Sequence, residues 1–482
     1  MRRLVTLVAL CALVVAVGEA TAAVCELGPD CHVWSVDVSG GGEYVAVGWG
    51  TRVSFFDIRS NAPLWTYDTG GYVEVVVLSD DGQKLAVAYN DPPTPYNYSS
   101  RGHIAFFDTV NDDPLWEFTT DYPINGHGVR AMDMSRDGSR IVAGTYLWFG
   151  YIAEPVGTVY VFDTTSPALI YTQSFPTSHM VVRLSGNGEY FVVGGFLFRM
   201  RSYDVDSGMM GETGWARDAY YSVALDLDAT IIAAGHGWSG RVDFYTRACH
   251  AVCEIFTGGT HRSMAMSDLG DRLVVSQYHN PDTTANGVWL IDVWSCDVVW
   301  FYDAGDDLVQ SVDMARDGSL MVGGGEGDKV YLFSESSEVP IYTQEVEGTI
   351  FEVAMSADGG YYAAAVEAGY LHVFSSAGTP HEMWSWSAPC HPTLCHVPPG
   401  NSNAAHTLTV GRNAACAHLA HHHMDYLGGC DRDTGAEALT TEGQTAQVDA
   451  TRDLNRDSEP AASPITTRGT RDRSGRTSKP LR

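Results

Sequence analysis

Acidic side chains recur at one position of a repeated apolar segment, and their spacing could support ion binding. Asp37, Asp133 and Asp313 occupy this position in three copies, and Arg183 occupies it in a fourth. Glu352 stands two positions earlier in its own copy. If the copies surround a common axis, these side chains form an acidic ring that could hold a cation or a basic group. Buried charges in proteins are usually paired, so pairing with backbone amides, Arg183 or water is the favoured interpretation.

A second group of candidate residues is aromatic and falls in two long insertions. The segments "YNDPPTPYNYSSRG" and "TYLWFGYIAEPVG" lengthen two neighbouring copies of the repeat. Long loops on a rigid scaffold often carry function, and exposed aromatic rings anchor protein or sugar ligands. The alternative, that these rings pack on one another and stiffen the loops, stays open. The candidate ligand-binding residues are Tyr96, Tyr98, Tyr146, Trp148 and Tyr151.

Two cysteine pairs flank the repeated region and predict disulfide bonds. Cys25 and Cys31 precede the first copy, and Cys390 and Cys395 follow the last. A bridge between the two pairs would clasp the first copy to the last and would stabilise the fold by closing a very long loop. Two local bridges, Cys25–Cys31 and Cys390–Cys395, are the competing arrangement, because short loops close easily.

Other cysteines and histidines give weaker indications. Cys249 and Cys253 are further disulfide candidates. The Cys/His-rich segment 390–430 could bind zinc, but it lacks the paired C-x-x-C spacing of a strong zinc site, so no metal site is predicted.

The elements that must position these residues are short strands, repeated eight times. A turn such as "SDDG" at Ser79 or "SRDG" at Ser135 returns at intervals of about 40 to 56 residues, which is typical of propellers and solenoids. Asp-Gly suits a tight hairpin because it tolerates positive φ. One apolar strand precedes each turn and three follow it. The sequence therefore predicts an all-β fold, an eight-bladed β-propeller of four-stranded antiparallel blades, with seven blades as the fallback.

The text of the repeat resembles two related propeller groups. The segment "NGHGVRAMDMSRDGSRIVAGT" is similar to a WD repeat in its order of Gly-His, Val, Asp-Gly and strand. The fourth-strand "PLW" looks more like the blades of quinoprotein-alcohol-dehydrogenase-like propellers. The second resemblance implies an oxidoreductase or electron-transfer protein that uses a quinone such as pyrroloquinoline quinone. Those enzymes hold the quinone with an adjacent-cysteine disulfide and a calcium site, and this chain has no adjacent cysteine pair, so no cofactor is predicted.

Charge and composition bound the location and the partners. The 482 residues carry 29 Lys+Arg and 59 Asp+Glu, a formal net charge of −30, which argues against nucleic acid as a partner. Residues 1–22 have the charged start, apolar centre and A-x-A end of a signal peptide, which predicts a secreted or cell-surface protein with no membrane span after cleavage. We expect the propeller over 23–389, the Cys/His-rich segment over 390–430 and a disordered tail over 431–482.

These observations favour a non-catalytic extracellular propeller that serves as a binding scaffold for another protein or a surface glycan. The quinoprotein-type oxidoreductase is the alternative. A purely structural component of a surface layer is a third possibility. Because propellers support many unrelated functions, the repeat itself does not choose among them.

Overall fold

The structure is a computed structural model, which describes eleven stretches of the chain. They are residues 31–92, 101–120, 128–146, 157–175, 180–195, 199–214, 219–278, 286–389, 393–397, 406–409 and 426–427.

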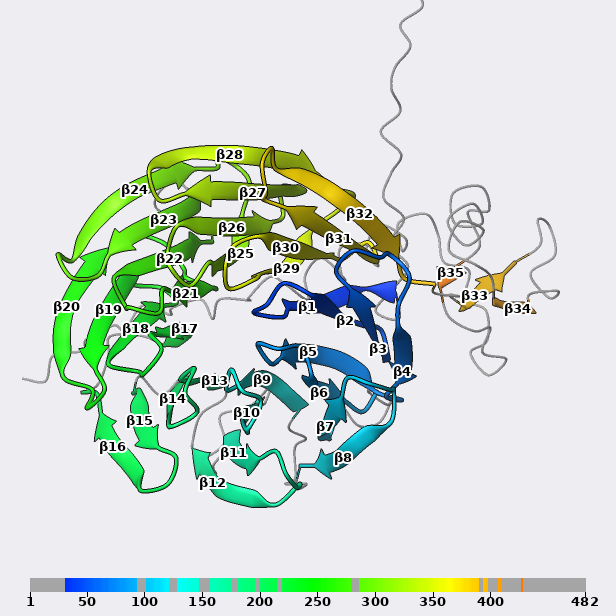
Figure 1. The fold of residues 1–482 in the computed structure, drawn as a ribbon, viewed down its shortest axis with the longest axis horizontal. Coiled ribbons are helices and arrows are strands. Elements are labelled where there is room, and N and C mark those ends of the chain that lie inside the picture. The colour runs from blue at the N-terminus through cyan, green and yellow to red at the C-terminus, as the bar shows by residue number, and fades with distance from the viewer. Residues whose placement is uncertain are drawn as a thin grey trace, which may run out of the picture. The chain divides into compact units, whose positions relative to one another are not determined.

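Thirty-two strands form eight blades, each a four-stranded antiparallel sheet whose strands pair in chain order (Figure 1). This confirms the predicted eight-bladed propeller. The first four blades consist of β1 (Val33–Val38), β2 (Tyr44–Trp49), β3 (Arg52–Asp57) and β4 (Trp65–Asp68); β5 (Tyr72–Leu78), β6 (Lys84–Asn90), β7 (Gly102–Asp108) and β8 (Pro114–Thr119); β9 (Gly128–Met134), β10 (Arg140–Tyr146), β11 (Gly157–Asp163) and β12 (Leu169–Phe175); and β13 (Met180–Leu184), β14 (Tyr190–Gly195), β15 (Arg201–Asp204) and β16 (Gly208–Glu212).

The second four blades repeat this plan and bring the chain back to the first blade (Figure 1). They consist of β17 (Tyr220–Leu225), β18 (Ile231–His236), β19 (Arg241–Thr246) and β20 (Ala251–Phe256); β21 (Met264–Met266), β22 (Arg272–Gln277), β23 (Gly287–Asp292) and β24 (Asp297–Asp303); β25 (Val309–Met314), β26 (Leu320–Gly325), β27 (Lys329–Ser334) and β28 (Ser337–Glu345); and β29 (Ile350–Met355), β30 (Tyr361–Val366), β31 (Tyr370–Ser375) and β32 (His381–Ser387).

After the eighth blade, the described residues form one small sheet. Its strands are β33 (Thr393–His396), β34 (His406–Thr409) and β35 (Tyr426–Leu427), in the order β34-β33-β35. Within the described stretches, no helix has the length and apolar character needed to cross a membrane.

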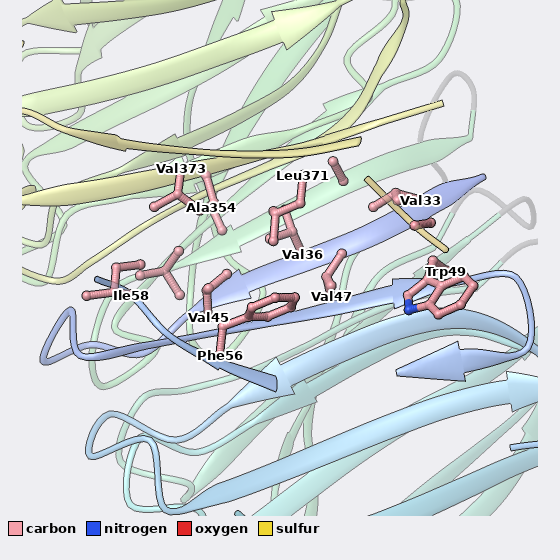
Figure 2. Close-up of a cluster of buried hydrophobic side chains, with 14 of the residues drawn as sticks. Val33, Val36, Val45, Val47, Trp49, Phe56, Ile58, Ala354, Leu371 and Val373 are labelled. Carbon is pink, nitrogen blue, oxygen red and sulfur yellow. The ribbon is translucent and has the colours of Figure 1, made fainter. Parts of the chain in front are cut away.

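The hydrophobic core is divided into eight clusters, one between each pair of neighbouring blades. The middle strands are apolar on both faces because each blade packs against two others. Figure 2 shows the cluster between the first and last blades, where Val36 and Phe56 of blade 1 pack with Leu371 and Val373 of blade 8. The ring is therefore closed by the same apolar packing that joins every other pair of blades.

The repeated turn ends each inner strand with a local hydrogen-bond pattern. In blade 3, Ser135 Oγ accepts the Arg140 N–H at 2.9 Å and donates to Asp137 at 2.7 Å. The turn glycine, Gly138, has φ +70°, a value that side chains disfavour. Because these contacts are short-range, the same few residue types form the turn in each blade, and its sequence is similar from blade to blade.

Each blade supplies all four of its own strands, so the ring closes without strand exchange. The sequence predicts four strands in every copy of the repeat, the first and the last included, and the pairing orders β1-β2-β3-β4 and β29-β30-β31-β32 confirm this.

One position of the outer strand latches a blade to the next. Trp65 Nε1 donates to Thr109 O at 2.9 Å, from blade 1 to blade 2. Trp384 Nε1 donates to Ile58 O at 2.7 Å, from blade 8 to blade 1. Each carbonyl belongs to the residue that follows the third strand of the next blade. The same bond is made by Trp116 to Thr164 O and by Trp300 to Glu335 O.

In blade 5 a disulfide takes the place of the tryptophan. Cys253 occupies the latch position opposite Phe244, and it is bonded to Cys296 in the turn between β23 and β24 of blade 6. Cys296 is not among the disulfide candidates predicted from the sequence.

The expectation of a disulfide at Cys249 is wrong. Cys249 is a buried free thiol with its Sγ 3.4 Å from Ser202 Oγ of blade 4. It lies in the core between blades 4 and 5, whereas Cys253 lies on the strand that faces blade 6. Cys31 is disulfide-bonded, and its partner is not among the residues whose side chains are described.

Candidate binding site along the central channel

The first strand of every blade lines the central channel (Figure 1). These inner strands all run in the same direction along the channel. We call the face where they begin the loop face, since the described strand ends that are joined by the connections between blades and between second and third strands lie there. The opposite face, where they end in the repeated turns, is the turn face.

Three of the predicted acidic residues each accept hydrogen bonds from their own blade and from the next blade. One oxygen of Asp37 accepts the Val38 N–H at 2.8 Å, and the other accepts the Leu78 N–H of blade 2 at 2.7 Å. Asp133 makes the same two bonds to Met134 and to Leu184 of blade 4, and Asp313 makes them to Met314 and to Met355 of blade 8. Both oxygens of each carboxylate are thus held by backbone amides.

Glu352 makes a related contact across the seam of the ring. Its Oε2 accepts the N–H of Val36, 316 residues away in sequence, at 3.0 Å. It therefore joins blade 8 to blade 1, as Ser35 joins blade 1 to the Val76 N–H of blade 2 at 3.1 Å.

The environment of the channel disfavours the ionised form of these acids. Burial raises the pKa of Asp313 and of Glu352 to about 6. Burial, reinforced by the negative charges of Asp313 and Glu352, raises the pKa of Asp37 well above its ordinary value. Burial also raises the pKa of Asp133, although the positive charge of Arg183 opposes this effect.

Arg183 supplies positive charge to this layer from blade 4. The positive charge of its guanidinium partly opposes the rise in the pKa values of Asp133, Asp313 and Glu352 that burial causes. No hydrogen bond or ion pair joins Arg183 to another side chain in the part of the chain that the structure describes. It acts at a distance on all three carboxylates, without closing on any one of them.

A cavity of about 250 Å³ lies between this acidic layer and the turns. It is large enough for several water molecules. The lining includes Asp37, Asp133 and Asp313 of the acidic layer and Asp80, Arg136 and Arg316 of the turns.

A closed ring of backbone hydrogen bonds surrounds the channel at the turn face. Each repeated turn donates one N–H to a carbonyl of the turn in the next blade. The eight bonds are Gly41 N to Asp80 O, Asp80 N to Arg136 O, Arg136 N to Gly186 O, Asn187 N to Leu227 O, Leu227 N to Asp268 O, Asp268 N to Arg316 O, Arg316 N to Ala357 O and Ala357 N to Gly40 O. The last bond closes the ring between blades 8 and 1 at 3.0 Å.

Two ion pairs cross the channel inside this ring. Arg136 of blade 3 binds Asp268 of blade 6 through both guanidinium nitrogens, with Nη1 2.8 Å from Oδ2. Arg316 of blade 7 binds Asp80 of blade 2. Each pair spans two intervening blades, so the turn-face end of the channel is bridged by charged side chains.

Small residues beneath the bridges leave room for the arginines. A Cβ on Gly40 would lie 2.9 Å from Arg316 Nη2 and 2.8 Å from Asp80 Oδ1. A Cβ on Gly186 would lie 2.6 Å from Arg136 Nε. A side chain at either turn position would displace its ion pair.

At the loop-face end of the inner strands lie residues that sequence reasoning missed. In blade 1 the strand register shifts between Val33 and Ser35, so Trp34 is left without a partner in the ladder. Such a β-bulge re-aims a side chain and is common beside functional sites. The equivalent bulged residues in other blades are Glu74, Arg130, Tyr221, Gln310 and Phe351.

These side chains contact one another between blades. Trp34 stacks on Phe351 with ring centroids 4.5 Å apart. Arg130 Nε lies 3.2 Å from Glu74 Oε2. The loop-face end of the channel therefore carries an aromatic surface on one side and charged groups on another.

A signal for the bulges is present in the sequence. Val36 and Val38 of β1 are core, so strict alternation would also place Trp34 in the core. Instead Val33 is buried, as are the equivalent residues Val129 and Ile350 of blades 3 and 8. An apolar residue directly before the bulge, such as Val33, therefore marks the break in the strict alternation of the strand.

The predicted aromatic loop residues are not placed by the structure. Tyr96, Tyr98, Trp148 and Tyr151 lie outside the described residues, and of Tyr146 only the backbone, at the end of β10, is described. The strand ends that flank both insertions lie at the loop face, since β6 ends opposite the start of β5 and β10 ends opposite the start of β9.

Comparisons with known proteins add no family. No protein-family model matches the chain, and no curated protein matches it significantly.

Among the described residues, no group of three or more His, Cys, Asp or Glu side chains is arranged to hold a metal ion.

Proposed function

We propose that this protein is a non-catalytic binding module whose ligand docks on the loop face, over the end of the central channel. The observation that carries the proposal is the row of β-bulges, which places six side chains of inner strands at that end. Aromatic, acidic, basic and amide groups together suit the recognition of a protein or glycan surface.

The two faces differ in a way that favours this choice. At the turn face, backbone hydrogen bonds form a closed ring around the channel. Two ion pairs cross the channel there, and in each pair the arginine binds the aspartate. The strand ends that flank the two aromatic insertions predicted to bind ligand lie at the loop face. A scaffold that is rigid at one face and carries varied side chains at the other resembles other loop-borne binding sites.

Two exposed tryptophans provide a matched test. Trp238, between β18 and β19, is on the loop face and is 61% exposed, and Trp294, between β23 and β24, is on the turn face and is 67% exposed. Purified protein carrying Trp238→Ala should lose capture of cell-surface glycans or proteins, whereas Trp294→Ala should retain it. Equal loss in both variants, or in neither, would argue against a loop-face site.

The insertions are tested by the same capture assay. We expect Trp148→Ala and Tyr96→Ala to weaken capture while melting is nearly unchanged. A large drop in melting temperature with capture intact would instead support mutual packing of the loop aromatics.

We further propose that the signal peptide directs export of the protein. We also propose that its blades are of the WD-repeat-like type.

The oxidoreductase alternative is tested by the absorption spectrum after addition of calcium and pyrroloquinoline quinone. A bound chromophore with dye-linked oxidation of an alcohol or sugar would replace the binding-module proposal.

A further inference from the structure

The seam between blade 8 and blade 1 depends on carboxylates that lie in one another's field. Glu352 holds the Val36 N–H across the seam, while Asp313 and Asp37 hold the amides of Met355 and Leu78 on either side of it. These contacts link blades 7, 8, 1 and 2 in sequence. The seam is also where the two ends of the ring meet without strand exchange.

We propose that this seam is proton-responsive, so that the ring is held more tightly when Glu352 is protonated than when it is ionised. A protonated carboxyl keeps a carbonyl oxygen that accepts the Val36 N–H, so the seam bond survives protonation. What changes is chiefly the cost of burying a charge, with a smaller repulsion from Asp313.

The charged groups around Glu352 have opposing effects on its pKa. Asp37 faces it from β1 and Asp313 from β25, and both are acidic. From across the channel, Arg183 of β13 contributes a positive charge that opposes the rise in the pKa of Glu352.

Two other contacts favour the ionised forms and partly offset burial. Arg316, in the turn after β25, is paired with Asp80 and opposes the rise in the pKa of Asp313. The Ser35 hydroxyl donates a hydrogen bond to Glu352 that opposes the rise in the pKa of Glu352. The layer thus holds four carboxylates and one guanidinium that pairs with none of them.

The direction of the pH effect follows from the sign of the shift. The pKa of Glu352 is raised from its ordinary value of 4.5 to about 6. A carboxyl whose pKa is higher in the folded protein favours folding below its unfolded pKa, and this contribution is lost as pH rises through the folded pKa. Between about pH 4.5 and pH 7 the seam should therefore weaken as the pH increases.

The test compares Glu352→Gln with the wild type at pH 5 and pH 8. Glutamine keeps an acceptor for the Val36 N–H and cannot ionise. We expect the melting temperature of the variant to exceed that of the wild type by about 2 °C at pH 8, and the difference to vanish at pH 5. Glu338→Gln, on the exposed surface of the same half of the ring, is the matched control and should shift melting equally at both pH values.

A Glu352→Gln variant that melts lower than the wild type by the same amount at both pH values would overturn the proposal. If that variant fails to fold, Asp313→Asn provides the same comparison, because burial also raises the pKa of Asp313 to about 6. A pH-independent difference for Asp313→Asn would then be decisive against a proton-responsive seam. Neither result bears on ligand capture at the loop face.

Discussion

Arg136 of blade 3 binds Asp268 of blade 6 across the central channel through two hydrogen bonds, and Arg316 of blade 7 binds Asp80 of blade 2 across the same channel through Nη2. Advancing by four blades converts one pair into the other. The segments "VRAMDMSRDGSRIVAG" and "VQSVDMARDGSLMVGG", in blades 3 and 7, show the same relationship in the sequence. The ring therefore consists of two similar halves, blades 1–4 and blades 5–8, and each half supplies the arginine of one ion pair and the aspartate of the other.

The first prediction concerns the strength of these pairs. In a double-mutant cycle with Arg136→Met and Asp268→Asn, we expect a coupling free energy of about 1 kcal/mol, because the contact is bidentate but only partly buried. Urea unfolding of the four proteins measures it. The exposed pair Arg59–Asp57 is the control and should give coupling close to zero. Equal coupling in the two cycles would show that the bridge adds nothing.

The second prediction concerns the tryptophan latch at the seam. Trp384→Phe removes the donor to Ile58 O and leaves that carbonyl without its partner, so unfolding should become easier by about 1 to 2 kcal/mol. Trp294→Phe, at an exposed turn, should change stability by less than about 0.5 kcal/mol. Denaturant titration compares the two. Similar small effects would mean that apolar packing alone holds the seam.

The third prediction concerns the disulfide between blades 5 and 6. Replacing Cys253 and Cys296 with serine opens a loop defined by a sequence separation of 43 residues. The chain-entropy account gives a loss of about 4 kcal/mol as an upper value. Reductant should lower the melting temperature of the wild type by more than that of the double variant, which keeps the disulfide of Cys31. If reductant affects both equally, another disulfide is responsible for the loss.

The same preparation reports on the free thiol. Burial raises the pKa of Cys249, so it should react with iodoacetamide only after unfolding. Rapid labelling of Cys249 in the native protein would contradict its buried position.

The fourth prediction concerns the partner of Cys31. Cys31 packs in the same hydrophobic cluster as Ala388, which is two residues before Cys390. We therefore expect a Cys31–Cys390 disulfide that clasps blade 1 to blade 8. Peptide mapping without reductant identifies the pair directly. A Cys25–Cys31 peptide would exclude the clasp.

The sequence alone determined the number of blades, the four strands in each and the core positions. These features are local: strand alternation has a period of two, and the Ser-x-Asp-Gly turn is held by bonds that span five residues or fewer. It also placed Asp37, Asp133 and Asp313 at one position of the inner strand, where the structure finds them lining one cavity. Repetition made this possible, since equivalent positions in each blade have equivalent surroundings.

Only the tertiary structure decided which residues meet across the ring. The Arg136–Asp268 pair joins residues 132 positions apart, and the disulfide puts Cys253 with Cys296 rather than with its near neighbour Cys249. The angle between successive blades fixes these partners, and no short stretch of sequence encodes that angle. The β-bulges likewise depend on how the inner strands crowd around a common axis, so the side chains of Trp34 and Phe351 became visible as neighbours only after the ring had closed.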